Sequence, residues 1–337
     1  MDHTEGSLEG LSGHLSLYLP EIKFRPLFPH VSRLLPSDQI ALLLATTRMV
    51  GMKCPGLNSL YSHLSLQFVD LKPHGAVSPF MHYRVDSLDH RFHLATIQVE
   101  GPGAKGSVRA FVRPVPRTQI DFEAARSMVH SDAFQGRRAW VVGGSRGLGE
   151  VAAKLLAAGG ATVTVTYHRG AADAERIAAE ILRGGGHVEV RALNVLDMPD
   201  RFDFSEPVKS APTDLLYFAT PFITPGECGV FSEELFNNLC RYYVFGFSRL
   251  VRNLAPHGLI RVLYPSSVYV EDPPENMAEY GAAKAAGEAT CAALGKCFRG
   301  VRFTKPRLPR MATDQTVSLV PLESEDPAPM ILDALRL

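Results

Sequence analysis

The chain has 337 residues, 46% of them hydrophobic and 21% charged, which suits two globular domains with buried cores. Its formal net charge is zero, so no basic excess points to nucleic acid or to an anionic membrane surface, and we expect neither as a partner. The polar start over residues 1–5 is unlike a signal peptide, and five cysteines without a CxxC pair indicate reduced thiols, so we expect a cytoplasmic protein.

The first part of the chain, over residues 1–120, has the pattern of one helix followed by a sheet. An apolar run of helical length opens with Ser37 as a cap-like residue and ends before Pro55 and Gly56. Segments of alternating polarity follow, separated by turn residues, which is typical of antiparallel strands and predicts an α+β domain. The expected elements are a helix over 37–53 and strands over Leu60–Val69, Val77–Val85, Phe92–Val99 and Ser107–Val112.

From residue 137 to residue 337 strands and helices alternate, which predicts a parallel, doubly wound α/β sheet. Residues 121–136 between the two parts have the character of a helical linker. The expected strands are Ala139–Val142, Ala161–Thr166, His187–Leu193, Leu215–Ala219, Leu259–Tyr264 and Val301–Thr304, and the expected helices are Gly147–Ala158, Ala171–Leu182, 232–254 and 276–295.

A glycine-rich turn lies between the first strand and the first helix of the second part. Its glycines permit a tight turn and a close approach of the backbone to a pyrophosphate, which the following helix N-terminus also attracts. Ordinary strand–helix turns also contain glycine, but this turn lies where a dinucleotide-binding fold needs it. The residues that we expect to contact a dinucleotide here are Gly143, Ser145, Arg146, Gly147, Leu148 and Gly149.

The end of the second strand indicates which dinucleotide would bind. An enzyme that prefers NADH carries an acid there, which binds the ribose 2′-hydroxyl. Here the strand ends in Thr166–Arg169, without an acid. Arg146 and Arg169 suit a 2′-phosphate because guanidinium groups bind phosphate in bidentate fashion, although the alternative for either is a solvated surface charge. We therefore expect NADPH/NADP as the cofactor.

A candidate catalytic set of three residues lies further along the chain. Tyr280 and Lys284 are four residues apart, so on a helix they share one face, and the cation is expected to lower the pKa of the phenol. Tyr280 would then serve as a general acid or base, with Lys284 also anchoring a ribose. Ser267 follows the strand over 259–264, where its hydroxyl can bond a substrate oxygen. A surface Tyr and Lys is the alternative for this spacing taken alone.

Together these motifs resemble the classical short-chain dehydrogenase/reductase family over residues 137–310, and most closely its β-ketoacyl thioester reductases. The resemblance implies a Rossmann-type fold that binds NADPH, with Tyr280 donating a proton while hydride attacks the carbonyl. It rests on the glycine turn, on Leu193–Asp197, on Ser266–Val268 and on the Tyr280/Lys284 pair. The further cofactor contacts that we expect are His168, Arg169, Asn194, Val195 and Ala219.

Three segments depart from the family pattern. Residues 218–221 read Phe-Ala-Thr-Pro in place of Asn-Asn-Ala-Gly, and Tyr243 aligns with the asparagine of the family's proton relay. Lys305–Pro309 replaces the usual Pro-Gly. We therefore expect an altered relay and an atypical substrate loop. Extended sugar-nucleotide epimerases share a Tyr-x-x-x-Lys-x-x-x-Glu motif, whose glutamate in this chain is Glu288, but the glycines of their turn are spaced differently.

Residues 37–115 resemble the later part of a MaoC-like hot-dog fold, the scaffold of acyl-thioester hydratases. Those enzymes carry an Asp and a His before the helix, whereas residues 15–35 contain only His30 and Glu21 as candidates. A non-catalytic hot-dog domain that dimerises or holds an acyl chain is the favoured interpretation. No metal site is expected among the histidines of this part, which are His63, His74, His82, His90 and His93.

The two resemblances together suggest a reductase of a 3-oxoacyl thioester, carried on coenzyme A or an acyl carrier protein, in fatty-acid-like or polyketide-like biosynthesis. We expect a homodimer or homotetramer. Three alternatives are a bifunctional reductase/dehydratase, a reductase of another carbonyl substrate, and a non-catalytic NADPH-binding scaffold.

Overall fold

The computed structural model describes residues 5–68, 79–113, 118–198, 211–313, 316 and 324–336. The described residues up to 113 belong to one compact unit and those from 118 onward to another, and each unit is treated by itself. Among the described residues, no helix combines the length and the apolar character needed to cross a membrane.

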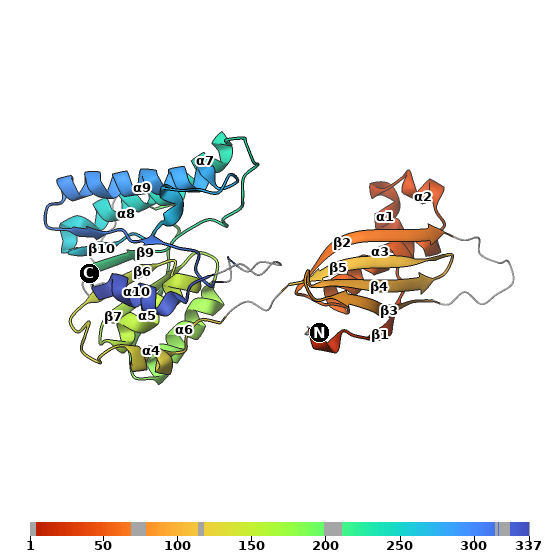
Figure 1. Ribbon diagram of the computed structural model, residues 1–337, viewed down its shortest axis with the longest axis horizontal. Coiled ribbons are helices and arrows are strands. Elements are labelled where there is room, and N and C mark those ends of the chain that lie inside the picture. The colour runs from red at the N-terminus through yellow and green to blue at the C-terminus, as the bar shows by residue number, and fades with distance from the viewer. Residues whose placement is uncertain are drawn as a thin grey trace. The chain divides into compact units, whose positions relative to one another are not determined.

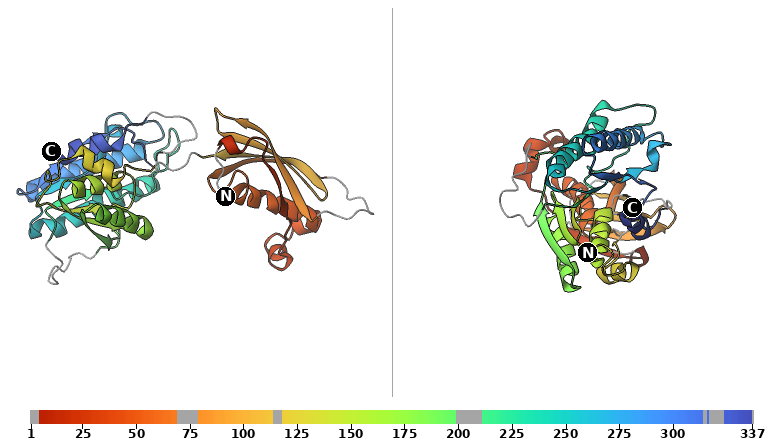
Figure 2. Two further views of the ribbon diagram at one scale, coloured as in Figure 1. Left: turned by 90° about the horizontal axis from the view of Figure 1, so that it is seen from below. Right: turned by 90° about the vertical axis from the view of Figure 1, so that its left-hand side faces the viewer.

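The N-terminal unit is a five-stranded antiparallel sheet packed on one long helix, α3 (Figures 1 and 2). Buried apolar side chains of α3, such as Leu42 and Met49, meet those of the sheet, such as Met81 and Ile97, in one core. The strand order is β1-β3-β4-β5-β2. The elements are β1 (Ser12–Ser16), α1 (Glu21–Leu27), α2 (Val31–Leu34), α3 (Ser37–Met52), β2 (Ser59–Phe68), β3 (Phe80–Asp89), β4 (Leu94–Gly101) and β5 (Ala104–Val112), after a short 3-10 turn over Glu5–Ser7.

The helix and four strands of this unit lie where the sequence predicts them, with ends that differ by a few residues. Ser37 is not the cap that its position suggested: Pro36 precedes the first turn, and the Ser37 hydroxyl donates to the Glu21 carboxylate at 2.8 Å. β1, α1 and α2 were not expected from the sequence. Val69, Val77 and His74 lie outside the described residues.

The C-terminal unit contains a six-stranded parallel sheet in the order β12-β10-β9-β6-β7-β8, as the strand–helix alternation predicts. Consecutive strands β6, β7 and β8 extend to one edge, and β9, β10 and β12 extend to the other, so the order reverses between β6 and β9. Ligands bind at such a reversal in doubly wound sheets. The strands are β6 (Arg138–Val142), β7 (Thr162–Tyr167), β8 (His187–Ala192), β9 (Asp214–Tyr217), β10 (Arg261–Leu263) and β12 (Arg302–Thr304), with the short pair β11 (Ser266–Ser267) and β13 (Arg307–Leu308).

Helices cover both faces of this sheet (Figure 1). One core contains the apolar residues of α4, α5, α6 and α10, and a second core on the other face contains those of α7, η2, α8 and α9. The expected helix over 232–254 is interrupted by a π-helical turn. The helices are α4 (Phe122–Met128), α5 (Gly147–Ala158), α6 (Ala171–Arg183), α7 (Glu233–Cys240), η2 (Arg241–Gly246), α8 (Phe247–Leu254), α9 (Ala278–Cys297) and α10 (Pro327–Arg336), and η3 (Ala255–His257) and η4 (Val268–Val270) are 3-10 turns.

Residues 121–136, which the sequence suggested to be a helical linker, do contain a helix, α4, but it packs into the C-terminal unit. Asp121 caps it by accepting from the Ala124 amide at 2.7 Å. Phe122 and Ala125 are buried in the same core as α5 and α6. A linker helix would leave its apolar side exposed, so this segment is part of the domain that it precedes.

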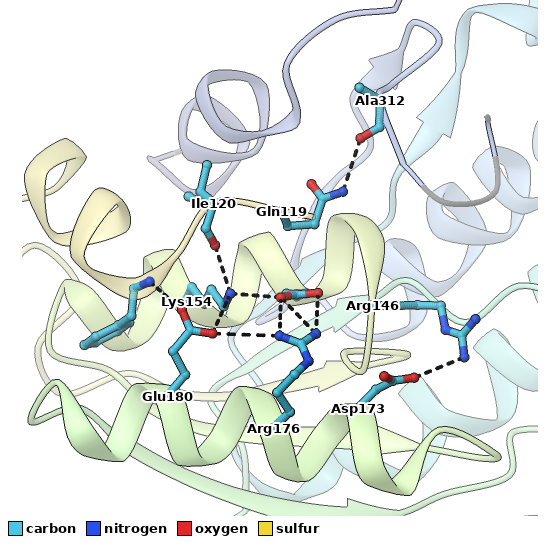
Figure 3. A network of polar contacts seen from close by, with 10 residues as sticks. Gln119, Ile120, Arg146, Lys154, Asp173, Arg176, Glu180 and Ala312 are labelled. Atoms are coloured by element: carbon cyan, nitrogen blue, oxygen red, sulfur yellow. Dashed lines mark hydrogen bonds and ion pairs between the residues drawn. The ribbon is translucent and has the colours of Figure 1, made fainter. Parts of the chain in front are cut away.

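A buried ion network fixes the entry to α4 (Figure 3). The Lys154 ammonium donates to Glu150 at 2.8 Å and to the Ile120 carbonyl at 2.8 Å, and lies 2.9 Å from Glu180. Glu180 in turn accepts from the Phe122 amide at 2.7 Å, and Arg176 binds Glu150 at 3.2 Å. Because these charges are paired and hydrogen-bonded, their burial is tolerated, and together they hold residues 120–122 against α5 and α6.

We expect Lys154→Met to lower the free energy of unfolding of the C-terminal unit by about 3 kcal/mol, because two carboxylates lose their buried partner. The matched control is Arg176→Met, whose side chain is 52% exposed and should cost about 1 kcal/mol or less. The measurement is urea unfolding followed by the fluorescence of Trp140, the single tryptophan, which is buried in this unit. Equal losses in both variants would contradict this account of the network.

Candidate active site

The turn between β6 and α5 has the close backbone packing that glycine permits. Gly143 and Gly147 adopt positive φ angles of 77° and 55°. A Cβ on Gly149 would lie 2.3 Å from the Gly143 carbonyl oxygen, and one on Gly143 would lie 2.8 Å from the Ala219 amide nitrogen. Side chains at 143 and 149 would therefore fill the space against the neighbouring backbone. The turn leads directly into the N-terminus of α5, whose amides can bind an anion.

The residues expected to contact a dinucleotide meet at one edge of the sheet. The glycine turn follows β6, His168 and Arg169 follow β7, and both of these side chains are exposed. Asn194 and the buried Val195 follow β8, and Ala219 follows β9. Since the carboxyl ends of neighbouring parallel strands share an edge, the structure brings these segments together. Ser145 is buried in the turn, Leu148 packs against the core that contains α5, and Asn194 accepts from the Leu196 amide at 3.1 Å.

Arg146 lies at the start of α5 and pairs with Asp173 in the first turn of α6. The Arg146 Nη2 donates to Asp173 Oδ2 at 3.4 Å, and both side chains are about half exposed (Figure 3). An ion pair of this exposure is weak and can exchange for another anion. Arg146 therefore lies beside the glycine turn in a position to bind a phosphate group.

The three residues of the candidate catalytic set also come together. Ser267 in β11 and Lys284 in α9 are 7% and 8% exposed, and a side-chain hydrogen bond joins Ser267 to Tyr280. Tyr280 and Lys284 lie one turn apart on α9. The Lys284 ammonium donates to the Pro265 carbonyl at 2.7 Å, which ties α9 to the segment that carries Ser267. Lys284 is buried and Tyr280 is partly buried against the core of this face, which argues against the alternative of a surface Tyr and Lys.

Burial dominates the protonation of this pair. It raises the pKa of the Tyr280 phenol to about 12, while the hydrogen bond from Ser267 acts in the opposite direction. It lowers the pKa of the Lys284 ammonium to about 7. From the sequence, Lys284 was expected to lower the pKa of Tyr280. That prediction was wrong in direction, because it considered the nearby charge and not the loss of water around the phenol.

Tyr243 contributes to the site in a way that the sequence analysis did not foresee. It lies in the π-helical turn η2, is 1% exposed, and places its hydroxyl 2.5 Å from Thr220 Oγ1. Its ring centroid is 4.1 Å from Lys284 Nζ. Alignment identified position 243 only as a departure from the family's asparagine. The available signal in the sequence was that an aromatic residue replaced the polar residue of the family at this position.

The atypical segment after β12 fixes the strand that carries Ser267. Residues Ser266 and Arg307 pair across β11 and β13. The Arg307 guanidinium donates twice to Glu288 on α9, at 2.8 Å each, and the Ser266 hydroxyl donates to the same carboxylate at 2.5 Å. Hydrogen bonding to Arg307 is the main cause that lowers the pKa of Glu288. Lys305–Pro309 thus positions β11 against α9.

Residues 137–304 match a family model described as short chain dehydrogenase. The chain is 29% identical over 202 residues to NADPH-dependent aldehyde reductase 2, chloroplastic, from Arabidopsis thaliana, a match that covers 54% of this chain and 74% of the relative. Two similar solved structures are a short chain dehydrogenase from Burkholderia cenocepacia J2315 in complex with NADP and a 3-oxoacyl (acyl-carrier-protein) reductase from Agrobacterium tumefaciens C58 with NADP bound.

The Burkholderia structure has 22% sequence identity and a TM-score of 0.50, and covers 59% of this chain and 89% of its own. The Agrobacterium structure has 18% identity and a TM-score of 0.52, and covers 60% and 87%. Residues 137–304 therefore form a domain of the short-chain dehydrogenase family. This confirms the expected oxidoreductase of that type and its Rossmann-type parallel sheet. The names of these relatives also support the expectation of NADP(H).

The buried lysine predicts a pH-dependent stability for the C-terminal unit. The folded form begins to release the Lys284 proton near pH 7, whereas an unfolded lysine keeps it to about pH 10.4. Because the unfolded chain binds more protons in this window, the free energy of unfolding rises with pH, by up to about 1.4 kcal/mol per unit. Urea unfolding of the wild type and of Lys284→Met, followed by Trp140, should show this rise only in the wild type. Parallel curves would exclude Lys284 as its source.

Proposed function

We propose that the C-terminal unit is an NADPH-dependent ketoreductase that converts a 3-oxoacyl thioester to the 3-hydroxyacyl form. The observation that carries the proposal is that the buried Ser267 and Lys284 and the partly buried Tyr280 converge in one site, on the same unit as the glycine turn. That combination supplies a proton donor, a partner for a developing oxyanion, and a binding site for a dinucleotide.

The residues present fit NADPH. The close backbone packing around Gly143 and Gly149, which an added Cβ would disrupt, holds the turn as a tight cradle at the N-terminus of α5, whose amides can bind a pyrophosphate. The residues directly after β7, His168 and Arg169, include no acid, which at this point would favour NADH. Arg146 and Arg169 are the groups that would hold a 2′-phosphate, with Arg146 leaving Asp173 to do so. A similar solved structure in complex with NADP supports this choice.

When bound, NADPH supplies the hydride, and the side chains handle the oxygen of the substrate. Tyr280 donates its proton to the carbonyl oxygen as negative charge develops there. Ser267 hydrogen-bonds the same oxygen and keeps Tyr280 oriented. Lys284 holds its place through the Pro265 carbonyl, which leaves its other two N–H donors for a ribose.

A thioester substrate is supported by the N-terminal unit and by one similar structure. The Agrobacterium protein is a 3-oxoacyl (acyl-carrier-protein) reductase. The N-terminal helix on a five-stranded antiparallel sheet suits the hot-dog domain proposed for residues 1–120, a fold that handles acyl thioesters. His30, the candidate dehydratase base, is exposed, which favours a non-catalytic hot-dog domain. We propose further that the acyl group is carried on coenzyme A or an acyl carrier protein, that the reaction belongs to fatty-acid-like or polyketide-like biosynthesis, and that the protein is a homodimer or homotetramer.

A free aldehyde is the second candidate substrate. It is favoured by the match to the Arabidopsis protein, which is named as an NADPH-dependent aldehyde reductase. The chemistry at Tyr280 would be the same, since either carbonyl oxygen needs a proton donor. The two candidates differ in what binds the remainder of the substrate.

We expect NADPH oxidation by the full chain with a short 3-oxoacyl thioester, and a loss of about a hundredfold or more in Tyr280→Phe, because the proton donor is removed. NADPH affinity, measured by fluorescence titration, should be unchanged in this variant. The matched control is Tyr269→Phe: its ring lies 6.2 Å from that of Tyr280, and its turnover should be close to that of the wild type.

The same assay with a free aldehyde separates the two candidate substrates. Turnover of the thioester at least about tenfold more efficient than that of the aldehyde supports the proposal. The reverse preference favours an aldehyde reductase. Tight NADPH binding with no oxidation of either would overturn both in favour of a non-catalytic binding protein.

Gly149→Ala should weaken NADPH binding by about tenfold or more, because its Cβ would meet the Gly143 carbonyl and force the cradle open. The control is Gly295→Ala, also in a helix of the C-terminal unit. There an added Cβ makes only ordinary contacts with Phe303, at 3.5 Å, and binding should be unchanged. Equal affinities in the two variants would show that NADPH does not use this turn.

A further inference from the structure

Lys284 ends in an enclosure of aromatic ring faces. Its Nζ lies 4.1 Å from the ring centroid of Tyr243, 5.2 Å from that of Tyr264 and 5.8 Å from that of Tyr280. Tyr243 and Tyr264 are each 1% exposed. The ammonium therefore sits among ring faces and not in water, with the Pro265 carbonyl accepting one of its protons.

The hydroxyls of these rings have other partners. The hydroxyl of Tyr243 is 2.5 Å from Thr220 Oγ1, and that of Tyr264 donates to the Tyr243 carbonyl at 3.3 Å. What Tyr243 and Tyr264 offer to Lys284 is consequently the electron-rich ring face, which attracts a cation and has little effect on a neutral amine. Such an attraction strengthens when the cation is removed from water.

The enclosure is tightly built. A Cβ at Gly287 on α9 would lie 1.8 Å from the Tyr264 hydroxyl, so that ring occupies space that only glycine leaves free. Tyr243 is held by the π-helical turn and is in the same buried core as Tyr264. Neither ring can move away from Lys284 without disturbing that core, so both faces remain close to the ammonium.

We propose that the ring face of Tyr243 keeps Lys284 in its charged, ammonium form, which makes Tyr243 a positioning residue for the Tyr280/Lys284 pair. The meaning of this role for catalysis rests on the proposed ketoreductase function. The effect of Tyr243 on the charge of Lys284 does not rest on that function, because it can be measured in the folded protein without cofactor or substrate. Tyr243 is the strongest candidate because its ring is nearest to the ammonium.

Lys284 is the group around this enclosure that titrates near neutral pH. The ionisable groups facing it are Tyr280 and Cys291 on α9, Tyr243 on η2 and Tyr264 after β10. Burial raises the pKa of all four, to about 12 for Tyr280 and for Cys291. A change in the pH dependence of the free energy of unfolding between about pH 6 and 9 that is absent in Lys284→Met therefore reports the titration of Lys284.

The test alters the charge distribution of the ring while keeping its shape. Tyr243→Phe keeps the ring face and loses the bond to Thr220. Pentafluorophenylalanine at position 243 keeps the ring but reverses its quadrupole, and avoids the cavity that Tyr243→Leu would leave. The first readout is the pH at which the free energy of unfolding begins to rise. Unfolding is monitored by the fluorescence of Trp140, in the protein without NADPH. The second is the high-pH limb of thioester turnover.

Loss of the attraction favours the neutral amine, so the fluorinated ring should move both transitions about one unit to lower pH, while Tyr243→Phe leaves them near the wild-type position. Identical transitions in the two variants would overturn the proposal, since a purely structural role would depend on ring shape alone. If no variant, nor the wild type, reduces the thioester, the proposed function fails, and the unfolding readout still decides the role of Tyr243.

Discussion

The hydrogen bond from Lys284 Nζ to the Pro265 carbonyl is the contact on which the arrangement of the site depends. It connects the middle of α9 to the chain just after β10, two residues before Ser267. Because Tyr280 lies one turn before Lys284 on α9, this single bond brings the phenol to the serine hydroxyl. Burial lowers the pKa of the Lys284 ammonium to about 7, and a lysine perturbed in this way beside a phenol is a feature typical of functional sites.

Residues that depart from the family pattern support that bond. Arg307 lies in the segment that replaces the usual Pro-Gly, and its double hydrogen bond to Glu288 holds β13 and β11 against α9. Tyr243 takes the place of an asparagine and encloses the ammonium with its ring. The departures that cast doubt on the site in the sequence thus have structural roles within it. They support the interpretation of a working enzyme over that of a vestigial fold.

The strand–helix alternation of the C-terminal unit and the long helix of the N-terminal unit could be predicted from the sequence, because both follow from clear periodicity. The short elements β1, α1 and α2 could not, since each has seven residues or fewer and none shows a clear period. Phe122 looked like part of a linker because a sequence does not show which core an isolated apolar residue joins. Ser37 failed as a cap because Glu21, sixteen residues away, takes its hydroxyl.

The three residues of the candidate catalytic set could be predicted to come together because fixed spacings along one helix and one strand define them. Their protonation could not be predicted, since burial decides it and burial is a property of the fold. The most direct measurement is a crystal structure of the full chain with NADP bound. The account predicts the pyrophosphate at the Gly143–Gly149 turn, a nicotinamide ribose hydrogen-bonded to Lys284, and the nicotinamide beside Tyr280. A cofactor bound elsewhere, or one whose nicotinamide lies away from Tyr280, would contradict it.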